Sequence, residues 1–251
     1  GPLYPGAGRA GGTRRPSPLD LVYPSTSHAS SSTMSKTILM FGSTGSTGSE
    51  ALKLALEGGH KVKAFVRTPS KIPEDLKGEN LTVVEGDITD AAAVKAAIEG
   101  VDIVMAFVGH PFKKVPEDKE AFSKFFVVLL EGCAEHGVKR LTYQAGGFSP
   151  LPGEKLPVFT RVLRAVMAKP MGISYGVEDN DRILQLVTEK GGDLDWTITR
   201  PGALSGGPSK KEAKTVAKMP NGPMKFVDLA AYTLKIAVEG EEIGKCPYVG
   251  Y

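Results

Sequence analysis

Apolar and polar residues follow two alternating patterns along this chain from about residue 34 onward. Short apolar runs rich in Val, Ile, Leu, Phe and Thr recur, and each is too brief to be a helix. The run from Val101 to Val108 is almost continuously apolar, which is typical of a strand covered on both faces of a sheet. The pattern predicts strands at Thr37–Phe41, Lys61–Val66, Leu81–Val84, Val101–Val108, Arg140–Gln144 and Asp195–Thr199.

Longer stretches with helical periodicity separate these runs. They predict helices at Ser46–Glu57, Ala91–Ile98, Lys119–His136 and Val177–Lys190. Glycines at positions 58, 59 and 137 supply C-terminal stops for two of them. Strands that alternate with helices through short connections form right-handed β-α-β units and a parallel sheet. We therefore predict a single α/β domain over residues 34–251, built as a doubly wound parallel sheet flanked by helices.

The first 33 residues differ in composition from the rest of the chain. They are rich in Gly, Pro, Ser and Arg and carry one acidic residue, Asp20. Such a composition cannot bury enough apolar surface to fold, so a disordered arm is expected. Three origins fit it: an expression tag with a linker, a transit-peptide remnant, or a native flexible arm, of which the first two are favoured. A cytoplasmic location is expected, and an organellar one is the alternative if the arm is a transit-peptide remnant.

Composition and charge exclude several classes of protein. The 31 basic and 28 acidic residues leave a net charge of +3, so no electrostatic footprint indicates nucleic acid. Cys133, Cys246 and the four scattered histidines lack the spacing of a disulfide framework or a metal site. The longest apolar runs fall short of the roughly 20 residues that span a bilayer. We expect a soluble monomer or small homo-oligomer that binds a small-molecule substrate, with no metal and no nucleic-acid or membrane partner.

The strongest local signal is a glycine-rich segment between the first predicted strand and the first predicted helix. Gly42, Gly45 and Gly48 form a G-x-x-G-x-x-G pattern. Residues without a Cβ let the backbone approach a pyrophosphate, and the following helix presents free N–H groups and its positive dipole end to that anion. No Lys-Ser/Thr pair follows the last glycine, which excludes a P-loop. A flexible loop is the plainer interpretation, but the strand–turn–helix context favours dinucleotide binding by a Rossmann-type sheet.

The end of the second predicted strand indicates which dinucleotide is bound. An NAD site usually carries Asp or Glu roughly 20 residues beyond the glycines, where it holds the ribose 2′-hydroxyl. Here the strand is followed by Arg67, with Lys71 shortly after it. A carboxylate would repel a 2′-phosphate, whereas a guanidinium binds it through two hydrogen bonds. An ordinary exposed arginine is the alternative, but the position favours NADP(H).

Asp87 follows the third predicted strand, in the stretch Val84–Ile88. In sheets of this kind the loop passes the adenine, and an Asp there can accept a hydrogen bond from the exocyclic amine. The alternative is a helix N-cap in the stretch Asp87–Asp90. The two roles are compatible.

Several segments of the chain together resemble one protein family. They are residues 42–48, 66–71 and 84–87, Gly109, the stretch 194–201 (Leu-Asp-Trp-Thr-Ile-Thr-Arg-Pro) and the stretch 226–230. From about Lys36 to Tyr251 the chain resembles the atypical, NmrA-like branch of the short-chain dehydrogenase/reductase superfamily, and more closely its flavin reductase (biliverdin reductase B) type. The resemblance implies that the chain binds NADP(H) through residues at the pyrophosphate (Gly42, Thr44, Gly45, Ser46, Thr47, Gly48), the 2′-phosphate (Arg67, Lys71), the adenine (Asp87, Ile88) and the nicotinamide cleft (Gly109, Pro201).

The chain departs from this superfamily at the positions that carry proton transfer. The Tyr-x-x-x-Lys pair of ordinary short-chain dehydrogenases is absent, because Tyr143 is followed four residues on by Gly147, and Tyr175 by Asp179. The serine that the flavin reductase type carries after its fifth strand, and the histidine after its sixth, are replaced as well.

Three polar residues remain as candidate catalytic residues. His110 either donates to a substrate oxygen or is an exposed loop residue. Gln144 either orients a carbonyl or carboxamide group or serves packing, and Tyr175 either reaches the cleft or is an ordinary core or surface tyrosine. We predict an NADP(H)-dependent oxidoreductase that reduces a small conjugated or carbonyl-bearing acceptor, such as a flavin or a quinone, which takes its proton from water. The alternative is a catalytically weak NADP(H)-binding sensor or scaffold of the NmrA-like type, which the missing Tyr-x-x-x-Lys pair favours.

Overall fold

The computed structural model describes residues 34–111, 114–168 and 170–251, so the arm expected over residues 1–33 lies outside the described residues. An eight-stranded sheet forms the centre, in the order β3-β2-β1-β4-β5-β6-β10-β8. Neighbouring strands run parallel except β8, which pairs antiparallel with β10 at one edge. These strands are β1 (Thr37–Phe41), β2 (Lys61–Val66), β3 (Leu81–Glu85), β4 (Ile103–Ala106), β5 (Arg140–Gln144), β6 (Asp195–Pro201), β8 (Lys214–Val216) and β10 (Tyr248–Gly250).

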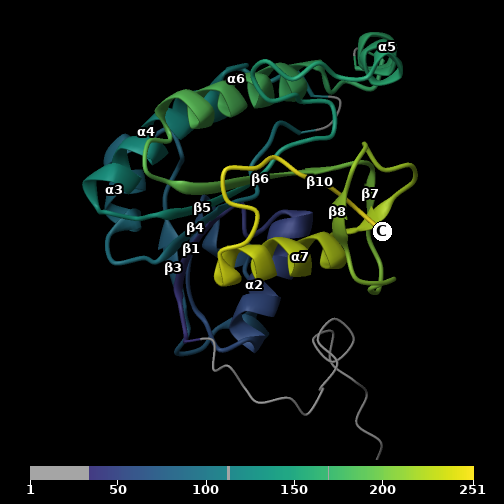
Figure 1. Cartoon of the computed structure of the whole chain (residues 1–251). Coiled ribbons are helices and arrows are strands. Elements are labelled where there is room, and N and C mark those ends of the chain that lie inside the picture. The colour runs from purple at the N-terminus through teal and green to yellow at the C-terminus, as the bar shows by residue number, and fades with distance from the viewer. Residues whose placement is uncertain (1–33, 112–113, 169) are drawn as a thin grey trace, which may run out of the picture.

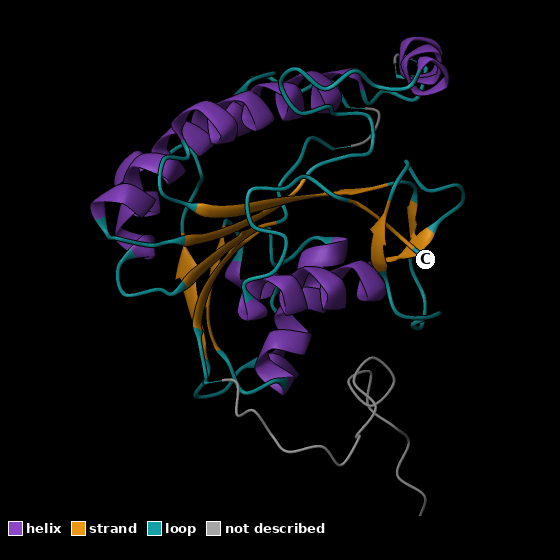
Figure 2. Cartoon of the chain, viewed as in Figure 1, coloured by secondary structure: helices purple, strands orange, loops and turns teal. Residues whose placement is uncertain are grey.

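Helices cover both faces of this sheet (Figures 1 and 2). One face is covered by α3 (Ala91–Ile98), α4 (Ala121–Glu135) and α6 (Ser174–Lys190), and the other by α2 (Ser46–Glu57) and α7 (Phe226–Glu239). A further helix, α5 (Val158–Met167), stands apart at one end of the molecule. The architecture confirms the predicted doubly wound α/β domain.

Strand β1 explains why the central strands are apolar at every position. Ile38 and Met40 pack into the core beneath α2 and α7, whereas Leu39 and Phe41 pack into the core beneath α3, α4 and α6. Side chains of a strand alternate between the two faces, so a sheet covered on both faces needs apolar residues throughout.

Most predicted elements are confirmed, and the differences lie at their ends. Strand β4 is shorter at both ends than the predicted Val101–Val108, and just before it the Asp102 carboxylate accepts a hydrogen bond from Thr37 N (2.7 Å). Helix α4 begins at Ala121 rather than at residue 119, and α6 begins at Ser174 rather than at residue 177.

The sequence pattern missed the C-terminal elements and α5. Helix α7 completes the core beneath α2, and β10 extends the sheet beyond β6. A separate pair of short parallel strands, β7 (Leu204–Ser205) and β9 (Met224–Lys225), lies beside them. Strands of two or three residues are too short for alternation to reveal them. No helix among the described residues is long and apolar enough to cross a bilayer.

Candidate functional site

The glycine-rich turn lies where the order of the strands reverses, between β1 and β4 at their carboxyl ends. Gly42 has a positive φ of 78°, and a Cβ on it would lie 2.4 Å from the carbonyl oxygen of Phe107. A Cβ on Gly48 would lie 2.1 Å from the carbonyl oxygen of Gly42, whereas one on Gly45 would lie 3.3 Å from the same oxygen. Real Cβ atoms do not approach backbone so closely, so Gly42 and Gly48 are required by the packing of the turn, and Gly45 is less constrained.

The beginning of α2 is suited to an anion. Gly45 is the N-cap and brings no capping side chain, and the first turn carries no acidic residue. The first intrahelical hydrogen bond runs from Ser49 N to Gly45 O (2.8 Å), so the amides of residues 46–48 have no partner within the helix. Thr44 and Ser46 are exposed beside these amides, and Thr47 is buried. The positive end of the helix dipole therefore faces a turn without bulky side chains.

Ser43 strengthens this interpretation. Its side chain is 1% exposed, and its Oγ has no hydrogen-bond partner among the described residues. A buried hydroxyl without a partner is costly unless a ligand or water completes it. We call the tight turn at Gly42 and Gly48, which has no room for a Cβ, the glycine cradle. Together with helix amides that lack an intrahelical partner and a buried Ser43 hydroxyl that lacks a partner among the described residues, it fits the pyrophosphate of a dinucleotide.

Two basic residues lie at the carboxyl end of β2. Arg67 directly follows the strand, and Lys71 ends the short 3-10 helix Pro69–Lys71; both are exposed. The strand pairs with β3, and the contact continues beyond both strands through Gly86 N, which donates to Val66 O (3.0 Å). Arg67 thus lies at the loop that carries Asp87.

Of the two acidic residues in this loop, Asp90 takes the helix-cap role. The Asp90 carboxylate accepts from Ala93 N (3.0 Å) and is the N-cap of α3. Asp87 Oδ1 accepts from both Thr89 N (2.9 Å) and Thr89 Oγ1 (2.8 Å). These hydrogen bonds lower the pKa of the Asp87 carboxyl, and the nearby positive charge of Arg67 lowers it further. Asp87 is therefore not the cap of the helix, and Ile88 beside it packs against the core.

The two residues expected along the cleft follow β4 and end β6. Gly109 is exposed, and a Cβ built on it would have no heavy atom within 4 Å. Pro201 is buried at the last position of β6, and its carbonyl oxygen would lie 3.0 Å from a Cβ on Gly147. Unlike the glycines of the turn, Gly109 is not required by packing within the chain.

His110 is held in a buried cluster and is not an exposed loop residue, whereas its donation to a substrate oxygen stays a prediction. Its side chain is 6% exposed, and Nε2 lies 2.9 Å from Asp179 Oδ2. The ring also packs edge-on against Phe122, with centroids 4.8 Å apart. The same carboxylate accepts from the amides of Phe122 (3.1 Å) and Ser123 (3.2 Å) in the first turn of α4.

Gln144 and Tyr143 end β5 in a second polar cluster. The Oε1 atom of Gln144 is buried and has no hydrogen-bond partner in the part of the chain that the structure describes. The Tyr143 hydroxyl donates to Asn180 Oδ1, and burial raises the pKa of this phenol. The phenol is therefore neutral and occupied, whereas the Gln144 amide has acceptor capacity that the chain leaves unused.

Helix α6 brings these clusters together. Asp179 and Asn180, adjacent on α6, contact the loop after β4 and the end of β5, respectively. Tyr175 lies one turn earlier, half-buried, with Lys119 Nζ 4.8 Å from the centre of its ring. No spacing in the sequence links Asn180 to Tyr143, and Asp179 stands out in the sequence only as the residue four positions after Tyr175.

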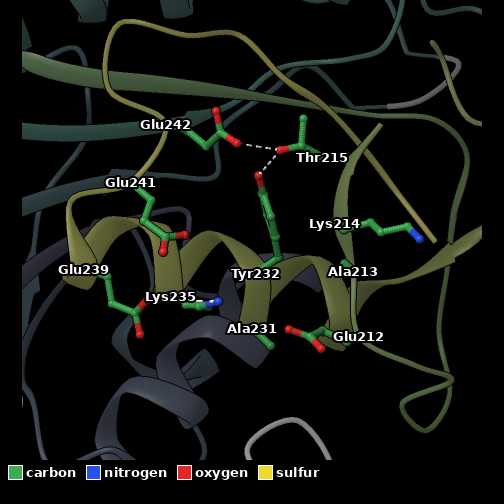
Figure 3. Close-up of a pocket in the computed structure, with 10 residues that line it drawn as sticks. All are labelled: Glu212, Ala213, Lys214, Thr215, Ala231, Tyr232, Lys235, Glu239, Glu241 and Glu242. Carbon is green, nitrogen blue, oxygen red and sulfur yellow. Dashed lines mark hydrogen bonds and ion pairs between the residues drawn. The ribbon is translucent and has the colours of Figure 1, made fainter. Parts of the chain in front are cut away.

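A separate pocket of about 480 Å³ lies between β8, α7 and the segment that follows α7 (Figure 3). Arg140, the first residue of β5, donates through Nη2 to Glu241 O (2.9 Å), which places this pocket near the amino end of the strand that Gln144 ends. Within it Thr215 Oγ1 lies 2.7 Å from the Tyr232 hydroxyl and donates to Glu242 Oε1 (2.8 Å). The described residues hold no group of three or more His, Cys, Asp or Glu side chains placed to bind a metal. This pocket is distinct from the glycine-rich turn.

Comparison with known proteins identifies the family. Residues 42–239 match a family described as NAD(P)H-binding. The chain belongs to this family. The match begins at the first glycine of the turn and extends through α7. The finding confirms a nicotinamide dinucleotide as the ligand and leaves the choice between NAD and NADP to the residues at the end of β2.

Curated relatives resemble only part of this chain. A 3-beta-hydroxysteroid dehydrogenase of Mycolicibacterium neoaurum is 32% identical over 140 residues, which are 49% of this chain and 37% of that protein. An NAD(P)H azoreductase of Xenophilus azovorans is 28% identical over 165 residues, 66% of this chain and 47% of that protein. The chain thus spans half or less of the length of these relatives.

Solved structures share the fold over nearly the whole domain. An anaerobillin reductase from Escherichia coli O157:H7 has a TM-score of 0.66 at 19% identity, covering 85% of this chain and 96% of that one. A wide-type short-chain dehydrogenase/reductase from Veillonella parvula, in complex with NADP, has a TM-score of 0.69 at 18% identity, covering 87% of this chain and 95% of that one. At this level of identity the likeness establishes the Rossmann-type fold.

Proposed function

We propose that the NAD(P)H-binding domain is an NADPH-dependent reductase for a small conjugated or carbonyl-bearing acceptor, such as a flavin or a quinone. The observation that carries the proposal is the combination of the glycine cradle at Gly42 and Gly48 with Arg67 at the end of β2. The named relatives include an azoreductase and dehydrogenases, and a reductase is among the structural neighbours, which supports the reaction class.

The cofactor roles are assigned from the geometry of the turn and its neighbours. The pyrophosphate lies against Gly42, Gly45, Gly48 and the side chains between and beside them (Thr44, Ser46, Thr47). Arg67 and Lys71 bind the 2′-phosphate, because their charges are exposed at the edge of the sheet. The Asp87 carboxylate, held through Oδ1 by Thr89, faces the adenine together with Ile88. Gly109 and Pro201 line the nicotinamide end.

The acceptor's proton comes from water in this proposal. When bound, NADPH supplies a hydride, and reduction of the acceptor then requires one proton. The Tyr143 hydroxyl donates to Asn180 Oδ1 and so does not offer that proton, and His110, whose Nε2 is paired with Asp179, is not required as the donor. The unused acceptor of Gln144 orients the nicotinamide carboxamide or the substrate. Tyr175, at the start of α6, contributes to the wall of the substrate space.

One observation favours a second candidate function, an NADP(H)-binding sensor or scaffold. His110 is paired with Asp179 and Tyr143 with Asn180, so these two groups are held by α6 rather than presented to a substrate. A protein that reads the redox state of the cofactor requires binding but no proton route. The Gln144 amide is compatible with both functions.

The test is NADPH oxidation by the full chain with flavin mononucleotide, a naphthoquinone and an aromatic aldehyde as acceptors. The Gly48→Ala variant is the control, because its Cβ would meet the Gly42 carbonyl oxygen at 2.1 Å and disrupt the turn that binds the cofactor. We expect turnover with at least one acceptor that the variant loses. Tight binding of both NADPH and NADP⁺ without turnover would support the sensor instead, and no binding of either would refute both functions.

A further inference from the structure

Helix α5 carries its apolar side chains on its outer face. Four residues at helical spacing form what we call the apolar stripe: Val158, Phe159, Val162 and Val166. Their exposure ranges from 56% at Val162 to 73% at Phe159. A surface helix of a soluble protein normally turns such a face toward its core. The helix stands away from the sheet, so none of the main core clusters includes this stripe (Figure 1).

The polar side of α5 faces the body of the protein. Thr160 is buried, and Arg164 donates through Nη1 to Phe148 O (3.0 Å) and pairs through Nη2 with Asp181 on α6. These contacts fix the rotation of the helix about its axis. The outward direction of the apolar stripe is therefore a consequence of the ion pair and the buried threonine.

The surroundings of the apolar stripe are basic. Between Lys155 and Val177 the sequence carries four basic residues and no acidic one. Arg164 is neutralised by Asp181, but Lys155 and Arg161 are exposed beside the helix. A short helix with an apolar face and basic flanks has the composition of segments that lie in the interface of anionic membranes.

A second copy of the chain fits this face less well. A helix of 10 residues is about 15 Å long, and the contact of two such helices falls short of the roughly 1,200 Å² that a stable dimer buries. Pairing two copies would also bring like charges together around Lys155 and Arg161. An anionic lipid surface accepts both the apolar side chains and the cations.

We propose that α5 docks the protein on an anionic membrane surface, with the apolar stripe among the acyl chains and Lys155 and Arg161 at the lipid phosphates. No apolar run in the sequence is long enough to cross a membrane, which is why no membrane partner is expected from the sequence. A helix that lies in the interface needs no such run. Because α5 lies in the connection from β5 to α6, the docked face lies toward the carboxyl end of β5, where Gln144 is the last residue.

The experiment measures flotation of the full chain with vesicles of phosphatidylcholine, with or without about one third phosphatidylglycerol. We expect binding to the anionic vesicles that is at least fivefold stronger than to the neutral ones and that weakens as salt is raised. Val162→Glu places a charge in the apolar stripe and is expected to lower binding at least tenfold. Ile243→Glu is the matched control, because Ile243 is 45% exposed but lies after α7; it is expected to bind like the wild type.

Three results would overturn the proposal. They are no flotation of the wild type, equal flotation of the two glutamate variants, and equal binding to neutral and anionic vesicles. Sedimentation equilibrium addresses the other occupant: a dimer that Val162→Glu dissociates would assign the face to a second copy. NADPH binding verifies that each variant is folded, and Phe159→Ser replaces Val162→Glu if that variant is not.

Discussion

The His110 Nε2 atom lies 2.9 Å from Asp179 Oδ2, which joins the loop after β4 to α6. Asp179 is 1% exposed and also accepts from two amides of the first turn of α4. A single carboxylate thus pairs with a histidine and accepts hydrogen bonds from amides at the N-terminus of a helix. The positive end of the helix dipole stabilises a carboxylate at this position. Three segments that are distant in the sequence are held together by this residue.

Replacing Asp179 should destabilise the domain more than any exposed acidic residue of α6. Asp179→Asn keeps the shape but weakens hydrogen bonds to three donors, and we expect a loss of about 2–4 kcal/mol in the free energy of unfolding. Urea denaturation measures it, with the exposed Glu178→Gln as control. A double-mutant cycle with His110→Ala isolates the pair; additive losses would contradict a direct contact.

The glycines of the turn should tolerate alanine unequally. A Cβ on Gly48 meets the Gly42 carbonyl oxygen at 2.1 Å, so Gly48→Ala forces the backbone apart and should weaken NADPH binding at least tenfold. Gly45→Ala, with its contact at 3.3 Å, should have a smaller effect, and Gly78→Ala, with nothing within 4 Å, should have none. Calorimetric titration gives the three affinities. Equal affinities for the Gly48 and Gly78 variants would remove the cradle from the proposal.

Arg67 should determine the preference between the two nicotinamide dinucleotides. Arg67→Ala removes a guanidinium from the 2′-phosphate, and we expect NADPH to bind about tenfold or more weakly, as for a charged hydrogen bond of about 1.5–3 kcal/mol. NADH binding should change little. Lys61→Ala, at the exposed amino end of the same strand, is the matched control. A parallel loss for both cofactors after Arg67→Ala would contradict the assignment.

The buried thiols predict a loss of stability in alkaline solution. Burial raises the pKa of Cys133 from 9.0 to about 12. Above pH 9 the unfolded chain loses this proton while the folded chain retains it, so stability falls as pH rises between these two values, by up to about 1.4 kcal/mol per pH unit for each thiol. Urea denaturation at several pH values gives the free energy of unfolding as a function of pH, and this free energy should fall less steeply with pH for Cys133→Ala than for the wild type. Identical slopes would show that the folded thiol ionises as readily as the unfolded one.

Much of the fold could be predicted from local pattern. The stretches Thr37–Phe41 and Ser46–Glu57 carry their own periodicity, and the glycines between them restrict the backbone without help from distant residues. The position of Arg67 could also be predicted locally, because it follows from where the apolar run of β2 ends. Strand β10, with three residues, is too short for alternation to reveal it, whereas α7 carries a clear helical pattern over Phe226–Glu239 but was not predicted.

The chain's own sequence determined the alternation of strands and helices, the glycine turn and the cations at the end of β2, because each depends on residues close together in the chain. Only the tertiary structure decided the partner of His110, the burial of Gln144 Oε1 without a partner among the described residues, and the outward apolar face of α5. Those features depend on contacts across long sequence separations, such as Asp179 with His110 and Arg164 with Asp181. Periodicity indicates that a helix has an apolar side. The direction in which the apolar side faces is determined by the contacts that the polar side makes with the rest of the protein.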